Sequence, residues 1–164
     1  MHPLILIGAA AGTAYVVHLL RSAKAAKELK YQLQKIQIYK ITWSEITLRV
    51  FVSFTNLEAA TLTVKQIYLD IFLNIDGSKH RIGTLNTDNI PVTLPGYATV
   101  QKSFDVKIPL QNLGIGILKI FQGYLTNGSL SLPDKAFLEG QIKTLGFTIP
   151  VNIEVPFNST PSAN

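Results

Sequence analysis

The stretch RVFVSFTNLEAATLTVKQIYLDIFLNIDG, from Arg49 to Gly77, decides most of the predicted fold. Apolar side chains alternate with mostly polar ones along 46–55, and the alternation returns along 67–75. A period of two with one apolar face is typical of a strand that is buried on one side. The pair Asp76–Gly77 is a strong signal for a tight turn. The stretch therefore predicts two long strands, with a connection at NLEAAT between them and a turn after the second.

The same alternation extends beyond this stretch in both directions. Its parity changes between Val64 and Ile67, which predicts a β-bulge near Lys65–Gln66. Pro150 indicates an edge strand or a bulge, and a turn is expected at Gly146. The further predicted strands lie at Ile36–Trp43, Ile82–Leu85, Val92–Leu94, Val100–Ile108, Leu138–Ile142 and Phe147–Val155.

One segment, LQNLGIGILKIFQGYL, has apolar residues at near-helical spacing and predicts a helix that Asn112 could cap. About seven strands with turns every 8–12 residues predict a β-sandwich. The expected fold is thus mainly β: an immunoglobulin/fibronectin-III-like β-sandwich with one added helix. We expect this domain at 37–157, followed by a polar tail at 158–164.

The first 36 residues differ from the rest in composition. The 18 residues from Pro3 to Leu20 contain no Asp, Glu, Lys or Arg. As a helix they would span about 27 Å, close to the thickness of a bilayer's hydrocarbon core. The basic segment RSAKAAKELK follows directly. This pattern predicts an N-terminal transmembrane helix and a short basic helical stalk at 1–36, while a secretory signal peptide and a buried helix of a globular domain remain open.

The predicted anchor carries two candidate contact sites. Gly8 and Gly12 form a GxxxG pair, which favours close packing of two helices. They begin a heptad-spaced series that ends at Leu29, Leu33 and Ile36, so a homo-oligomer through this helix is one possibility. The other is an amphipathic stalk that lies on the membrane or on the chain's own body. The residues expected to contact anionic lipid are Arg21, Lys24, Lys27 and Lys30.

Charge and composition restrict the function classes. The chain of 164 residues has a net charge of +5 and no cysteine, which excludes disulfides and thiol catalysis. Residues 1–36 hold five basic residues and one acidic residue, whereas 37–164 hold ten and nine. A nucleic-acid-binding domain normally carries its own basic face. The nearly neutral body therefore argues against nucleic acid as a partner.

Catalytic chemistry is not expected from the sequence. His80 stands in a predicted hairpin loop without a second ligand at metal spacing, and His2 and His18 belong to the N-terminal segment. The carboxylates are scattered over polar faces and turns, and Gly114–Gly116 lacks the further residues of a phosphate loop. We therefore predict no catalytic residues, no cofactor and no metal site, and a protein that is not an enzyme.

The order of segments resembles a known family. ITLRVFVSFTN, LTVKQIYLDIFLN, IGTL, ATVQKSFDVKIPL, a glycine-containing helix and FTIPVNIEVPF follow one another as in the late embryogenesis abundant (LEA) type 2 family, also called the WHy domain. That family is marked by Asn-Pro-Asn after the first long strand, and here only Asn56 agrees. The resemblance implies a fibronectin-type sandwich with one helix, commonly behind an N-terminal anchor, and a protective or binding role without catalysis.

Three functions follow as hypotheses. The first is a membrane-anchored structural or interaction protein whose partners are the lipid bilayer and other protein subunits. It would be a single-pass component of a larger assembly, in a virion membrane or a bacterial cell envelope. The second is a stress-protective or envelope binding protein of the WHy type. The third is a small-ligand or lipid carrier whose sandwich encloses a cavity.

Overall fold

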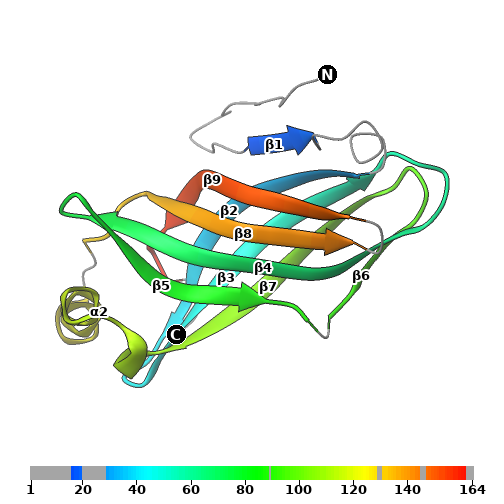
Figure 1. The fold of residues 1–164 in the computed structure, drawn as a ribbon. Helices are drawn as coiled ribbons and strands as arrows, with labels where there is room; N and C mark the ends of the chain where they lie inside the picture. The colour runs from blue at the N-terminus through cyan, green and yellow to red at the C-terminus, as the bar shows by residue number, and fades with distance from the viewer. Residues whose placement is uncertain (1–15, 20–28, 89, 129–130, 145–146, 162–164) are drawn as a thin grey trace.

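The computed structural model describes residues 16–19, 29–88, 90–128, 131–144 and 147–161 (Figure 1). Strands account for most of these residues, and one α-helix follows a short 3-10 helix. The elements are β1 (Val16–Leu19), β2 (Leu29–Ile41), β3 (Glu45–Asn56), β4 (Leu62–Ile75), β5 (Ser78–Asn86), β6 (Val92–Leu94), β7 (Thr99–Pro109), η1 (Leu110–Asn112), α2 (Ile115–Asn127), β8 (Lys135–Thr144) and β9 (Thr148–Asn158).

The strands form one curled sheet of nine strands, with the order β5-β4-β8-β9-β2-β3-β7. β1 pairs with β2, and β6 pairs with β4. The pairings are antiparallel except between β2 and β9, which run parallel and pair at Ile36 with Phe157 and at Gln37 with Asn158. The predicted immunoglobulin/fibronectin-III-like β-sandwich is therefore wrong. The strands do not separate into two sheets, because the last residues of β9 join β8 to β2.

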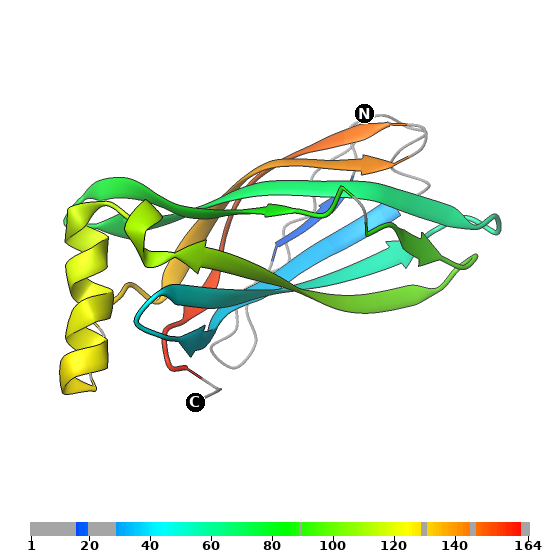
Figure 2. The same ribbon diagram turned by 90° about the horizontal axis from the view of Figure 1, so that it is seen from below.

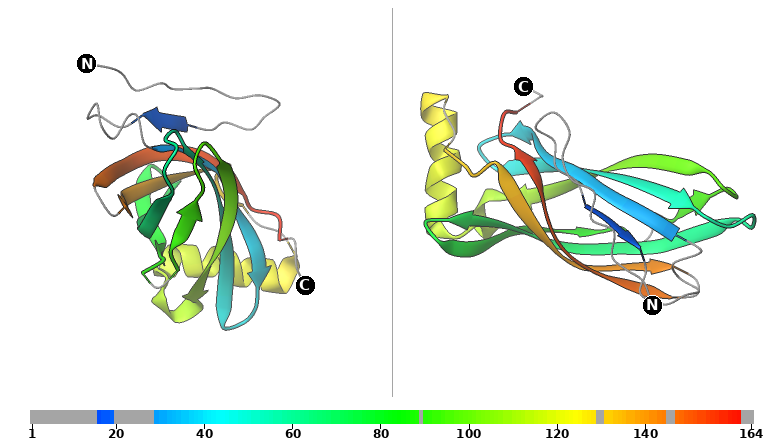
Figure 3. Two further views of the ribbon diagram at one scale, coloured as in Figure 1. Left: turned by 90° about the vertical axis from the view of Figure 1, so that its right-hand side faces the viewer. Right: turned by 90° about the horizontal axis from the view of Figure 1, so that it is seen from above.

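The curl brings the two edge strands, β5 and β7, towards each other (Figures 2 and 3). Gly83 of β5 lies so close to β7 that a Cβ atom there would be 2.7 Å from Ile108 Cδ1. Only glycine allows this approach without a shift of Ile108. The concave side of the sheet thus closes over a shared apolar interior.

That interior contains the apolar half of each alternating pattern. Leu48, Val50 and Val52 of β3 are fully buried, as are Leu69 and Ile71 of β4. Burial of such side chains, at roughly 1.5–3 kcal/mol each, is the main favourable contribution to folding. Helix α2 stands at one end of the sheet (Figure 2), with Ile117 and Phe121 buried.

Most of the predicted strands are confirmed, and so is the bulge, because the β4–β8 register shifts between Val64 and Gln66. Pro150 pairs with Gln141 of β8, and among the described residues β2 pairs with β9 only at Phe157 and Asn158, which agrees with the expected edge position. Asn112 does not cap the helix, because it belongs to η1 and the N-cap residue is Gly114. The turn expected at Gly146 lies outside the described residues.

The predicted transmembrane helix and helical stalk are contradicted. Val16–Leu19 is a strand paired with β2, and β2 runs without interruption across the expected domain boundary at residue 36. Among the described residues, no helix has the length and apolar character needed to cross a bilayer. The proposed single-pass membrane location, in a virion membrane or a bacterial envelope, is therefore not supported.

The last three residues of the expected heptad series show why the helical interpretation failed. Leu29, Leu33 and Ile36 are buried in the core from within β2, with 0%, 1% and 0% of their surface exposed. The β2–β3 register shifts between Leu33 and Lys35, which leaves Gln34 as an extra residue. A β-bulge changes the parity of the side chains, so a spacing of four and then three fits a bulged strand as well as a helix.

Candidate functional site: a basic face on β2, β3 and β7

The outer side of β2, β3 and β7 carries a group of basic side chains. Successive side chains of a strand point to opposite sides, and directly opposed residues of paired strands share a side. The register places Lys40 and Lys107 on either side of Thr47, which alternates with the buried Ile46 and Leu48. We call this group the basic face. Its members are Lys30, Lys35 and Lys40 of β2, Arg49 of β3 and Lys107 of β7.

Two bulges in β2 put its three lysines on the same side. The lysines are five residues apart, a spacing that would place neighbours on opposite sides of a regular strand. Gln34 and Tyr39 each stand without an opposed residue in β3, where the register shifts. Each extra residue reverses the parity once. Lys30, Lys35 and Lys40 are therefore opposed to the outward-facing Thr55, Phe51 and Thr47.

Arg49, at the centre of the basic face, is held on two sides. Its guanidinium lies 3.7 Å from the centre of the Tyr39 ring. It donates two hydrogen bonds to the Asp105 carboxylate, from Nε at 2.7 Å and from Nη2 at 2.9 Å. These hydrogen bonds lower the pKa of Asp105 and raise the pKa of Arg49. Arg49 is thus engaged within the protein and is less available to a partner.

The lysines of the basic face differ from Arg49 in this respect. Among the described residues, no carboxylate lies within ion-pair distance of Lys30, Lys35, Lys40 or Lys107. The Lys35 ammonium lies 4.8 Å from the centre of the Phe51 ring, which leaves its charge accessible. Thr47, between Lys40 and Lys107, is only 8% exposed, as expected where long lysine stems lie over a short side chain.

The outer side of β4, β5, β8 and β9 has a different arrangement, and we call it the paired face. Lys79 contacts Glu139. Arg81 contacts Asp70 at 3.0 Å, and the Asp70 carboxylate also accepts a hydrogen bond from Thr84. The paired face is completed by Lys135, which contacts Glu154 at 3.0 Å. Most of its cations therefore have an internal counter-charge.

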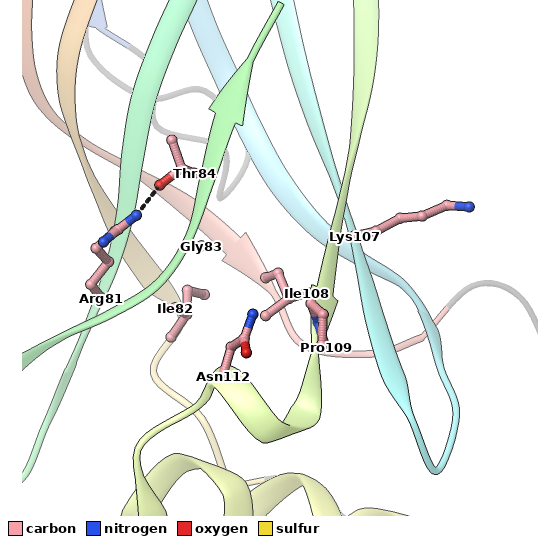
Figure 4. A pocket seen from close by; sticks show the side chains of 8 residues that line it. All are labelled: Arg81, Ile82, Gly83, Thr84, Lys107, Ile108, Pro109 and Asn112. Atoms are coloured by element: carbon pink, nitrogen blue, oxygen red, sulfur yellow. Dashed lines mark hydrogen bonds between the residues drawn. The ribbon is translucent and has the colours of Figure 1, made fainter.

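A hollow of about 350 Å³ lies where β5 approaches β7 (Figure 4). Ile82, Ile108 and Asn112 point into it, whereas Lys107 points away. Arg81, at its rim, is already bound to Asp70 and Thr84. Asn112 is thus the main polar group that could meet a ligand there. The described residues also contain no group of three His, Cys, Asp or Glu side chains that could hold a metal ion.

The candidate residues from the sequence have different outcomes. Gly8, Gly12, Arg21, Lys24 and Lys27 lie outside the described residues. Lys30, predicted to contact anionic lipid, is in β2 and belongs to the basic face. The other members were not singled out from the sequence, although polar residues recur between the apolar ones from Lys30 to Lys40. That pattern identifies one side of the strand only when the positions of the two bulges are known.

Comparisons with known proteins add little. No protein-family model matches the chain, and no curated protein matches it. Among solved structures, the chain is similar to one described as "Crystal structure of protein from Archaeoglobus fulgidus", with 14% sequence identity and a TM-score of 0.46. The match covers 76% of this chain and 94% of that one. The resemblance to the LEA type 2 or WHy family therefore gains no support from these comparisons.

Proposed function

We propose that this chain is a non-catalytic interaction domain that binds an acidic surface of another protein through its basic face, as part of a larger assembly. One observation carries the proposal: four lysines share one side of β2, β3 and β7, and none of them has a carboxylate partner among the described residues. Asp105 and Glu45 lie on the same outer side and offset part of this charge, so a net excess of positive charge remains. Such an excess attracts a surface of opposite sign and increases the rate of association.

Protein is favoured over nucleic acid because the arginine of this face is already engaged. Arginine is the usual residue for bidentate recognition of phosphates, and the one arginine of this face is engaged by Asp105. The free cations are lysines, which act as point charges and suit dispersed carboxylates as well as phosphates. We expect binding that weakens with salt, because Lys40 and Lys107 are exposed and Lys30 and Lys35 are partly exposed, and such charges are screened within about 10 Å at 0.1 M salt.

The test uses polyglutamate of about 25 residues, a flexible chain that its like charges keep extended and that is long enough to reach along the basic face. Its affinity for the full chain is measured by fluorescence anisotropy at low and high salt. The triple variant Lys35→Glu/Lys40→Glu/Lys107→Glu is expected to lose at least about tenfold in affinity, since each exposed pair contributes roughly 0.2–1 kcal/mol and reversal adds repulsion.

A matched control separates the basic face from net charge. Lys65→Glu/Lys119→Glu/Lys143→Glu changes the total charge by the same amount, at lysines outside the basic face that have no ion pair with a described residue. This variant is expected to retain most of the affinity. Equal losses in both triple variants would contradict the proposal. Tighter binding of a single-stranded oligonucleotide of the same length would replace protein by nucleic acid as the partner class.

A further inference from the structure

Two turns stand at the opposite ends of the basic face, and each exposes a large aromatic side chain. The turn between β2 and β3 carries Trp43, which is 69% exposed, and the turn between β6 and β7 carries Tyr97, which is 71% exposed. The two turns lie at opposite ends of the sheet (Figure 2). The Lys40 and Lys107 row of the basic face is next to the first turn, and the Lys30 row is next to the second.

Trp43 is displayed on a turn with fixed geometry. Thr42 N–H donates to the Glu45 carbonyl at 2.9 Å, and Thr42 Oγ1 accepts from Glu45 N–H at 3.1 Å. The Leu110 N–H also donates to the Ser44 carbonyl at 2.9 Å, which ties the turn to η1. A rigid turn loses little conformational entropy on binding, so an exposed tryptophan on it is suited to be an anchor residue.

Tyr97 is held in a backbone conformation that its side chain disfavours. Its φ is 55°, in the left-handed region where glycine is usual. The glycine of this turn is needed one residue earlier, because a Cβ atom at Gly96 would collide with the Ala59 carbonyl oxygen. Hydrogen bonds from Tyr97 N–H to the Glu58 carbonyl and from Ala98 N–H to the Pro95 carbonyl fix the turn.

The strain at Tyr97 therefore has no compensation in the core, since the ring is mostly exposed. Glycine or asparagine would adopt this backbone conformation at lower cost. Strained residues that persist in a structure are concentrated at binding and catalytic sites. An exposed aromatic ring kept at a strained position points to a contact with another molecule.

We infer that Trp43 and Tyr97 are two apolar anchors at the ends of one elongated interface, with the basic face between them. This inference rests on the proposed function and specifies its partner: an elongated acidic protein segment with an apolar side chain near each end. β3 has 12 residues between the two turns, so the segment must span about 35–40 Å. Charge complementarity with the four free lysines requires the middle of the segment to be acidic.

The experiment compares two peptides on the full chain: the polyglutamate of about 25 residues and the same peptide with leucines at both ends. The leucine-ended peptide is expected to bind at least about fivefold tighter, in the range for burial of a few apolar groups. Trp43 is the chain's single tryptophan, so its emission should shift to shorter wavelengths when the leucine-ended peptide binds.

Two variants complete the test. Trp43→Ser and Tyr97→Gly should each reduce the preference for the leucine-ended peptide while the affinity for polyglutamate is retained. Tyr97→Gly should not lower the thermal unfolding midpoint. A lower midpoint would be expected if the tyrosine had only a structural role. Equal affinity for both peptides, or an unchanged preference in both variants, would overturn the inference while the proposed function stands. If neither peptide binds, the proposed function fails and the inference fails with it.

Discussion

The basic face and the paired face are built by the same rules and differ in how their charges are arranged. Both are the outer sides of strands whose inner residues fill one core. On the paired face, Lys79, Arg81 and Lys135 each contact a carboxylate. On the basic face, Arg49 alone has such a contact among the described residues, and the lysines have none.

This difference separates what stabilises the fold from what is available to a partner. Exposed ion pairs contribute little to stability, typically below about 1 kcal/mol. The unpaired lysines of the basic face therefore cost the fold little, and their uncompensated potential is directed to the solvent. The paired face has already neutralised most of its potential internally. We expect an acidic partner to distinguish the two faces for this reason.

The largest expected effect tests whether the inner and outer sides are assigned correctly. Val50→Asp places a carboxylate on the fully buried side of β3 and should destabilise the fold by about 3–5 kcal/mol. Thr47→Asp, on the outer side between Lys40 and Lys107, should cost less, about 1–2 kcal/mol, because the site is only 8% exposed but both lysines can approach the new charge. Urea unfolding of the two variants measures the contrast. Similar losses would mean that the outer side of β3 is not where the basic face lies.

A smaller effect concerns the end of the basic face next to Tyr97. The Asn56 side chain is buried, and its Nδ2 donates to the carbonyls of Ala60, Leu94 and Pro95 at 2.7, 3.0 and 3.2 Å. Asn56→Ala removes the donor to these three carbonyls and should lower the free energy of unfolding by about 2–3 kcal/mol.

The matched substitution for Asn56 is Asn86→Ala at the edge of the paired face. Asn86 is exposed and accepts a hydrogen bond from Gln66 at 2.9 Å. Asn86→Ala should lower the free energy of unfolding by less than about 0.5 kcal/mol, the usual size for a substitution at an exposed position. Thermal unfolding of the two variants provides the comparison. A loss at Asn86 as large as that at Asn56 would show that the two ends do not differ in how they are held.

The sequence predicts the strands well, because burial on one side imposes a period of two that is visible locally. It does not predict how the strands close into one sheet. The join between β2 and β9 consists of two residue pairs, Ile36 with Phe157 and Gln37 with Asn158, and neither segment shows a local sign of the other. Because the sequence does not show this join, we expected two separate sheets packed as a sandwich.

The candidate site was mostly hidden for a related reason. The basic face depends on β7 lying next to β3 and on bulges at Gln34 and Tyr39, and none of these is encoded by spacing alone. The sequence does show that Leu29, Tyr31 and Leu33 alternate with polar residues. This alternation is typical of a strand, and a heptad repeat does not require it. Lys30 was singled out as basic, but its assignment to a membrane stalk followed from the helical interpretation of the same residues.

A last and small expected effect sharpens the comparison, because one substitution should move stability and binding in opposite directions. Asp105→Asn removes the carboxylate that holds Arg49 and should cost less than about 1 kcal/mol at pH 7, since the two side chains are partly exposed, at 28% and 40%. The pKa of Asp105 is lowered by the Arg49 hydrogen bonds. The contribution of the pair is therefore present above the carboxyl's unfolded pKa of about 3.9 and is lost as the pH falls through the folded pKa. Urea unfolding at pH 7 and in acid measures this loss.

Binding should respond to the same substitution with the opposite sign. Asp105→Asn releases Arg49 and removes one negative charge, which raises the net charge of the basic face by one, so polyglutamate should bind about twofold to fivefold tighter. Asp70→Asn makes the matched change on the paired face, where it releases Arg81, and should leave the affinity nearly unchanged. Both variants raise the net charge by one, so a general attraction would increase their affinities equally. An equal increase would remove the distinction between the two faces, whereas an increase confined to Asp105→Asn locates binding on β2, β3 and β7.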